Sequence, residues 1–141
     1  MQVHGTTVAL NGKGVLILGP SGSGKSTLAL QLMAVGAQLV ADDRTDLVKD
    51  GGDIVAHCPE TILGQIEARG LGILAAVPGQ PARLAAIVDL GRESVDRMPR
   101  SQFHDILGVA LPLVLGPYRP HLYAALRQLL IGGMITQGKS A

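Results

Sequence analysis

The chain has 141 residues, a length typical of one domain, and its 12 basic and 11 acidic side chains give a net charge of +1. This balance argues against a polybasic nucleic-acid-binding protein and against an acidic tail protein. Because 47% of the residues are hydrophobic and 16% are charged, we do not expect disorder, and no uncharged run is long enough to span a membrane.

A glycine-rich stretch near the start of the chain separates the first two elements that the sequence predicts. The continuous apolar run Val15–Leu18 predicts a strand buried on both faces. Leucines at helical spacing predict a helix over Lys25–Val35, with Gly36 as its C-cap. Gln38–Ala41 then predicts a second strand that delivers two carboxylates at its end. This alternation of strands and a helix predicts an α/β domain.

Turn-forming residues divide the middle of the chain into further strands. Asp46–Lys49 and Asp53–His57 flank the turn Asp50-Gly51-Gly52, which is a hairpin signal. Gly70–Val77 and Arg83–Asp89 predict two more strands, with a proline-containing turn between them.

The last third of the chain alternates between polar and apolar segments. Gly91–Phe103 is polar and irregular, whereas Ile106–Leu115 is apolar and broken by Pro112. Pro120–Leu130 predicts an amphipathic helix with its proline at the first helical position. We expect the apolar face of this helix to lie in the core or in a subunit interface rather than against a cofactor.

The glycine-rich stretch fits the phosphate-binding pattern G-x-x-x-x-G-K-[ST]. Glycines let successive backbone N–H groups point at phosphate oxygens, and the following helix directs its positive end at the same anion. Lys25 would neutralise charge on the β- and γ-phosphates, and Ser26 would hold Mg²⁺. The alternative is a glycine-rich turn with a surface lysine. The nine residues expected around ATP are Gly19, Pro20, Ser21, Gly22, Ser23, Gly24, Lys25, Ser26 and Thr27.

Two adjacent carboxylates, Asp42 and Asp43, end the second predicted strand. In proteins with this loop, a strand-end aspartate often holds or orients Mg²⁺. The two aspartates could divide the work, one lying near the metal and the other acting as general base toward a hydroxyl. The alternative is a solvated strand end that leads into Arg44, because aspartate is a common turn residue.

Four ordered motifs resemble the HPr kinase/phosphorylase family. They are His4-Gly5 with Gly12–Ile17 and the phosphate loop; Leu39–Asp43; Glu67–Ile73; and Asp96-Arg97 followed by Ile106–Pro112. The resemblance runs from about residue 2 to 115 and is to the short, single-domain members known from alphaproteobacteria, which lack the family's N-terminal domain. It implies an α/β P-loop nucleotide-binding domain of the HPr kinase C-terminal type, with a mixed sheet and flanking helices. We expect this catalytic domain over residues 1–137 and a loose tail over residues 138–141.

The resemblance implies an ATP-dependent kinase that phosphorylates a serine of HPr, the phosphocarrier of the sugar phosphotransferase system. Asp43 matches the family's proton acceptor, and Arg97 matches a later catalytic arginine. His4 and Lys25 match other active-site positions. The family's hexamers imply a homo-oligomer, in agreement with the low charge and high apolar content of this chain.

The family also implies a Mg²⁺ site. Ser26 and Glu67 match its metal ligands, and we expect Asp42 to lie nearby. Glu67 and Arg69 alternate on an extended segment, so their side chains would face the same side. The alternative for these two residues is an exposed ion pair.

Some residues have a simpler interpretation when they are considered without the family. His4 would be an exposed histidine near the N-terminus, and Arg97 would be a solvated arginine in a polar loop. The remaining histidines and the single cysteine show no metal-ligand spacing, and we interpret them as structural: His57, Cys58, His104 and His121. One cysteine excludes an internal disulfide, and without a leader segment we expect a cytoplasmic protein.

Many members of the family also run the reverse reaction, in which inorganic phosphate removes the phosphoryl group from phospho-HPr and yields pyrophosphate. The P-G-R-N element tied to that activity is absent, and Gly116–Pro120 occupies roughly its place. We therefore expect kinase activity to exceed phosphorylase activity. Two other classes of function stay open, namely a small-molecule kinase and a regulatory module that binds nucleotide without turnover.

Overall fold

The structure, a computed structural model, describes residues 1–93 and 102–133. The predicted catalytic Arg97 and the predicted tail at residues 138–141 lie outside these ranges. Two α-helices, a short 3-10 helix and ten strands make up the described chain. They are β1 (Gln2–Leu10), β2 (Lys13–Leu18), α1 (Lys25–Ala34), β3 (Gln38–Ala41), β4 (Arg44–Asp50), β5 (Asp53–His57), η1 (Glu60–Ile62), β6 (Gln65–Ala68), β7 (Gly72–Ala75), β8 (Ala82–Glu93), β9 (Gln102–Ile106), β10 (Val109–Gly116) and α2 (Leu122–Gly132).

Eight of these strands form one mixed sheet, in the order β2-β1-β4-β5-β8-β10-β9, with β3 paired to β1. β8 runs parallel to both β2 and β10, whereas the other pairings of the described strands are antiparallel. Because β2 pairs with β8 as well as with β1, the strands β2, β1, β4, β5 and β8 close into a ring. The expectation of a mixed sheet with flanking helices is confirmed.

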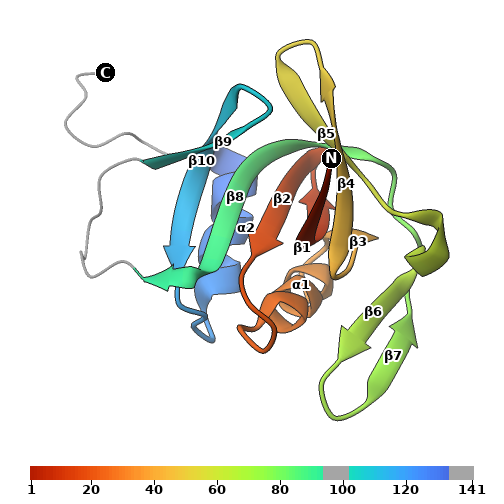
Figure 1. Cartoon of the computed structure of the whole chain (residues 1–141). Helices are drawn as coiled ribbons and strands as arrows, with labels where there is room; N and C mark the ends of the chain where they lie inside the picture. Colours follow the sequence, from red (N-terminus) through yellow and green to blue (C-terminus); the bar gives the residue numbers. More distant parts are fainter. Residues whose placement is uncertain (94–101, 134–141) are drawn as a thin grey trace.

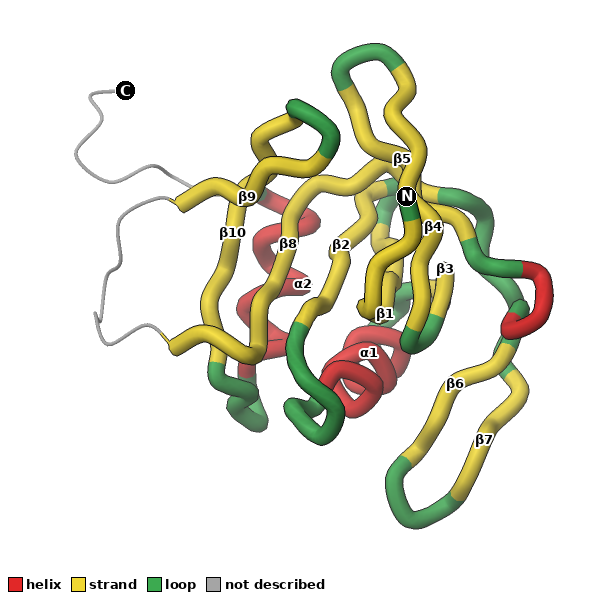
Figure 2. The backbone as a smooth tube through the Cα atoms, in the orientation of Figure 1, coloured by secondary structure: helices red, strands yellow, loops and turns green. Residues whose placement is uncertain are grey.

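Both helices cover the same face of the sheet (Figures 1 and 2). The sheet has a hydrophobic core on each face, and alternate residues of the buried strand β2 contribute to both. Val15 and Ile17 pack with the helices, and Leu16 packs on the opposite face. The core on the helix side includes one apolar face of each helix, namely Leu28, Ala29 and Leu32 from α1 and Leu122, Leu126 and Leu130 from α2.

Neither helix in the described part of the chain is both long and apolar enough to cross a membrane.

The hairpin of β6 and β7 is separate from the main sheet and projects from the body of the molecule (Figure 1). Ile66 on β6 is fully buried against the helix-side core and anchors this hairpin. All four residues of β7 are exposed. The hairpin thus has one attached strand and one outer strand.

The structure confirms the predicted strand at Val15–Leu18, the helix that begins at Lys25, the strand Gln38–Ala41 and the hairpin around Gly51. The predicted strand over Gly70–Val77 is confirmed as β7 (Gly72–Ala75), which begins two residues later because the chain turns at residues 69–71 between β6 and β7. Gly70 lies in this turn with φ of +87°, a conformation that glycine adopts without steric cost.

Two predictions that concern prolines are wrong. Pro112 does not break the segment, since it pairs with Phe103 of the edge strand β9, and the pairing with β8 begins only at Leu113. Pro120 is not the first helical residue, because α2 begins at Leu122 with His121 at its N-cap. The strand β1 was not predicted.

Candidate active site

The glycine-rich loop at residues 19–24 joins β2 to α1, as the sequence predicted. Leu28 donates the first helical hydrogen bond to the carbonyl of Gly24 (2.9 Å), so α1 starts where the loop ends. Gly24 itself has φ of +103°, and a Cβ there would stand 3.1 Å from the ring of Tyr118. This position therefore excludes a side chain both by its backbone conformation and by its neighbour.

Lys25 folds its side chain over this loop. Its ammonium donates hydrogen bonds to the carbonyls of Gly19 (2.6 Å) and Pro20 (3.1 Å). These two bonds fix a positive charge beside backbone groups of the loop and at the start of a helix, where the helix dipole is also positive. The combination creates a strongly anion-attracting position.

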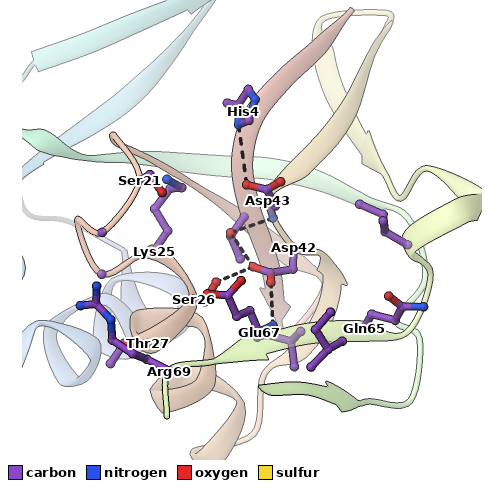
Figure 3. A pocket seen from close by; sticks show the side chains of 16 residues that line it. His4, Ser21, Lys25, Ser26, Thr27, Asp42, Asp43, Gln65, Glu67 and Arg69 are labelled. Carbon is purple, nitrogen blue, oxygen red and sulfur yellow. Dashed lines mark hydrogen bonds and ion pairs between the residues drawn. The ribbon is translucent and has the colours of Figure 1, made fainter. Parts of the chain in front are cut away.

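Asp42 is a buried carboxylate that joins three parts of the chain. Its Oδ1 accepts hydrogen bonds from the hydroxyls of Thr6 and Ser26, each at 2.8 Å, and its Oδ2 accepts one from the backbone N–H of Glu67 at 2.9 Å (Figure 3). β1, the first turn of α1 and β6 are thereby tied to the end of β3. A buried carboxylate is tolerated here because protein donors replace water at both oxygens.

Asp43 is turned the other way, although it is the next residue. It has φ of +68°, and its backbone is held against β1, with its N–H donating to Thr6 Oγ1 (3.1 Å) and its carbonyl accepting from Gly5 (2.9 Å). Its side chain is 64% exposed and lies 3.7 Å from His4, measured from Oδ1 to Nδ1. The two predicted carboxylates therefore have different environments, because Asp42 is buried and hydrogen-bonded at both oxygens whereas Asp43 is accessible.

A pocket of about 590 Å³ lies between the glycine-rich loop, the end of β3 and the β6–β7 hairpin. Thr6, Gln65, Arg69 and Ile73 also line it, and of these only Arg69 was singled out in the sequence. The predicted residues Gly19, Pro20 and Ser23 belong to the loop but do not line the pocket. The predicted residues that do line it are His4, Ser21, Gly22, Gly24, Lys25, Ser26, Thr27, Asp42, Asp43 and Glu67.

The oxygen ligands in this pocket fit a magnesium ion. Within the described ranges there is no group of three or more His, Cys, Asp or Glu side chains that could form an all-protein metal site. The pocket offers instead the Ser26 hydroxyl and the carboxylates of Asp42 and Glu67. Mg²⁺ is commonly bound by one or two carboxylates together with substrate phosphates, so this small donor set suits it.

The segment that follows β10 supports the loop from outside the pocket. Tyr118 packs against Gly24, and its hydroxyl accepts a hydrogen bond from Gln31 Nε2 of α1 at 2.9 Å. Arg119 is exposed and does not line the pocket. Sequence reasoning missed this contact of Tyr118, because nothing local links residue 118 to residue 24.

Two curated proteins are similar to this chain in sequence over most of its length. The chain is 39% identical over 126 residues to an HPr kinase/phosphorylase of Cupriavidus metallidurans, covering 81% of this chain and 39% of the relative. It is 34% identical over 135 residues to an HPr kinase/phosphorylase of Clostridium perfringens, covering 84% of this chain and 43% of the relative. The chain thus spans about two fifths of the length of these curated relatives.

A solved structure resembles almost the whole chain. It is the Hpr(Ser) kinase/phosphatase from Coxiella burnetii, with a TM-score of 0.78 and 29% sequence identity, covering 93% of both chains. Residues 1–78, more than half of the chain, match the family described as HPr Serine kinase C-terminal domain. These residues contain the glycine-rich loop, both aspartates and Glu67, so the chain belongs to the HPr serine kinase C-terminal domain family.

Proposed function

We propose that this chain is an ATP- and Mg²⁺-dependent protein kinase that phosphorylates a serine of an HPr-like phosphocarrier protein. The observation that carries this proposal is that one pocket is lined by both Lys25, at the start of α1, and Asp43, which follows β3. A cation held over a glycine-rich loop suits the phosphates of ATP, and an accessible carboxylate across the pocket suits an incoming hydroxyl.

ATP binding would rest on the loop amides, Lys25 and the N-terminus of α1. Ser26 and Glu67 would hold Mg²⁺ beside Asp42, and the bound ion supplies charge neutralisation at the phosphates. Because Asp42 already accepts the hydrogen bond of Ser26, it orients the hydroxyl of that residue. These groups form a P-loop nucleotide site of the kind that the sequence pattern implies.

Transfer would use Asp43 as general base. Its exposed carboxylate takes the proton as the serine oxygen attacks the γ-phosphorus, and the bond from that phosphorus to the β–γ bridging oxygen breaks to release ADP. His4, 3.7 Å from Asp43, can donate a hydrogen bond to a phosphate oxygen or to this carboxylate. The catalytic contribution of the protein is mainly positioning and charge stabilisation.

The names of the relatives support HPr as the acceptor. The matched proteins are HPr kinase/phosphorylases, and the structural neighbour is an Hpr(Ser) kinase/phosphatase. Exposed apolar side chains on the described surface, such as Leu71, Val77 and Phe103, agree with a homo-oligomer or with a docked protein. The acceptor and the assembly are therefore parts of the same proposal.

The test is phosphoryl transfer between purified components. The protein is incubated with Mg·ATP and HPr, and the phosphorylated residue of HPr is identified by mass spectrometry of its peptides. The proposal expects stoichiometric phosphate on one serine. Phosphate on a small-molecule hydroxyl with none on HPr, or ATP binding without turnover in the presence of HPr, would contradict it.

A further inference from the structure

The side chains that line the pocket include fewer positive than negative charges, although the pocket is proposed to bind an anionic nucleotide. Among the described lining residues, Lys25 and Arg69 are permanent cations, whereas Asp42, Asp43 and Glu67 bear carboxylates. Two positive and three negative charges leave a formal charge of −1, with His4 neutral. The phosphates of ATP are strongly anionic, so each cation of the lining would favour their binding.

Arg69 reaches the glycine-rich loop from the opposite wall. It follows β6 directly, in the turn of the β6–β7 hairpin, and its side chain extends toward the loop (Figure 3). Its Nη2 lies 3.9 Å from the position that a Cβ on Gly22 would take. The guanidinium is therefore next to the loop backbone, although about 47 residues separate them in the sequence.

The guanidinium of Arg69 is not occupied by another group in the described part of the chain. The ion pairs there join His4 to Asp43 and Arg83 to Asp50 and Asp53. The exposed Glu67–Arg69 ion pair, which was the alternative interpretation of the sequence, is not among them. Arg69 thus offers planar paired donors of the kind that bind phosphate oxygens in a bidentate way.

The hairpin that carries Arg69 is anchored next to the catalytic groups. Ile66 is buried in the helix-side core, and the backbone N–H of Glu67 donates to Asp42. The same Asp42 carboxylate accepts from Ser26 at the start of α1. These contacts fix the position of β6, which directly precedes Arg69, relative to the start of α1.

We propose that Arg69 is a nucleotide-binding residue that extends from the β6–β7 hairpin to contact the phosphates of ATP beside the loop. This inference rests on the proposed function, since it names a second cation for the same nucleotide site. Its role is to bind phosphate oxygens through the guanidinium, which places the β6–β7 hairpin over the bound nucleotide.

The test compares Arg69→Gln, Arg69→Lys and Arg127→Gln with the unmodified protein. Arg127 is an exposed arginine on α2 and serves as the matched control for loss of one positive charge. The dissociation constant for Mg·ATP is measured by titration calorimetry, and the unfolding temperature is measured without nucleotide. We expect Arg69→Gln to weaken Mg·ATP binding by about tenfold, as for loss of one charge-assisted hydrogen bond, with an unchanged unfolding temperature.

Arg69→Lys is expected to bind Mg·ATP with an affinity between those of the unmodified protein and Arg69→Gln, because it keeps the charge but loses the paired donors. Arg127→Gln is expected to bind as the unmodified protein does. Equal affinity in Arg69→Gln would overturn the role of Arg69 while leaving the proposed function intact. Weaker binding together with a lower unfolding temperature, and without recovery in Arg69→Lys, would show a structural role and overturn it too. Failure of the unmodified protein to bind Mg·ATP would instead contradict the proposed function.

Discussion

The hydroxyl of Ser26 donates a hydrogen bond to the carboxylate of Asp42, with 2.8 Å between Oγ and Oδ1. This bond ties the first turn of α1 to the end of β3, and the other oxygen of Asp42 holds the backbone of Glu67. One buried carboxylate thus sets the relative positions of the two residues proposed to hold Mg²⁺. The side chain of the next residue, Asp43, is exposed and accessible to a reacting hydroxyl.

Replacing Asp42 with asparagine is expected to reduce stability. The amide would present N–H groups where Asp42 now accepts from Thr6, Ser26 or the Glu67 N–H, so at least one buried donor loses its acceptor. The expected loss is about 1–3 kcal/mol in the free energy of unfolding, measured by urea denaturation. Asp53→Asn is the control, because it removes only an exposed ion pair with Arg83. Equal unfolding midpoints for both variants would show that the Asp42 contacts contribute little.

Replacing Gly24 with alanine is expected to disturb the loop. The new Cβ would lie 3.1 Å from the Tyr118 ring at a φ of +103°, so both contact and backbone conformation oppose it. Gly12→Ala is the matched control, since Gly12 has φ of +75° but no atom within 4 Å of an added Cβ. We expect the Gly24 variant to lose about 1–3 kcal/mol of stability and the Gly12 variant to lose less, by thermal or urea unfolding. The reverse order would contradict the packing of Tyr118 against the loop.

Replacing Glu67 with glutamine is expected to raise the Mg²⁺ concentration needed for half-maximal activity. Only the backbone of Glu67 is engaged by Asp42, so the exposed side chain can change without disturbing that contact. A neutral amide is a poorer ligand than a carboxylate for a hard cation. The Mg²⁺ titration is repeated with Glu60→Gln, an exposed glutamate in η1 that does not line the pocket. If the midpoint for Glu67→Gln matches that control, Glu67 does not hold the metal.

The reverse reaction is expected to be slower than the kinase reaction. It would require inorganic phosphate beside a phosphoserine, and two anions in one pocket need additional positive charge. In the segment Gly116–Pro120, Tyr118 packs against the loop and Arg119 does not line the pocket. Pro117 and Pro120 have no N–H to donate. The measurement is pyrophosphate released from phospho-HPr with Mg²⁺ and phosphate. A rate equal to that of the kinase reaction would show that other residues replace the missing turn.

The sequence predicted the elements around the loop because their signals are local. A continuous apolar run, three glycines and leucines at helical spacing identify β2, the loop and α1 without reference to the rest of the chain. The strand β1 lacks such a signal. Its buried centre is Gly5, Thr6, Thr7 and Val8, and the threonines are satisfied by distant partners, Asp42 and Thr45. Only the folded sheet makes these polar residues suitable for burial.

In the candidate site, too, the sequence predicted the features that have a local signal and missed those that depend on distant residues. The adjacent pair Asp42 and Asp43 could be predicted as functional, but the residues alone did not say which one is accessible. The left-handed conformation of Asp43 and the hydrogen bonds of Thr6 separate them, and both depend on the pairing of β1 with β3 and β4. The approach of Arg69 to the loop likewise depends on a hairpin whose turn the sequence pattern did not identify.

The role proposed for Asp43 can be tested by measuring the rate of phosphoryl transfer. Phosphoryl transfer from ATP to HPr is followed at saturating Mg·ATP in the unmodified protein and in Asp43→Asn, and the dissociation constant for Mg·ATP is determined for both. We expect unchanged nucleotide affinity and a transfer rate lower by about 10²–10⁴-fold, the effect of losing a general base. The stability of the variant should also be unchanged, since the side chain is exposed. Transfer at the unmodified rate in Asp43→Asn would contradict the proposed mechanism.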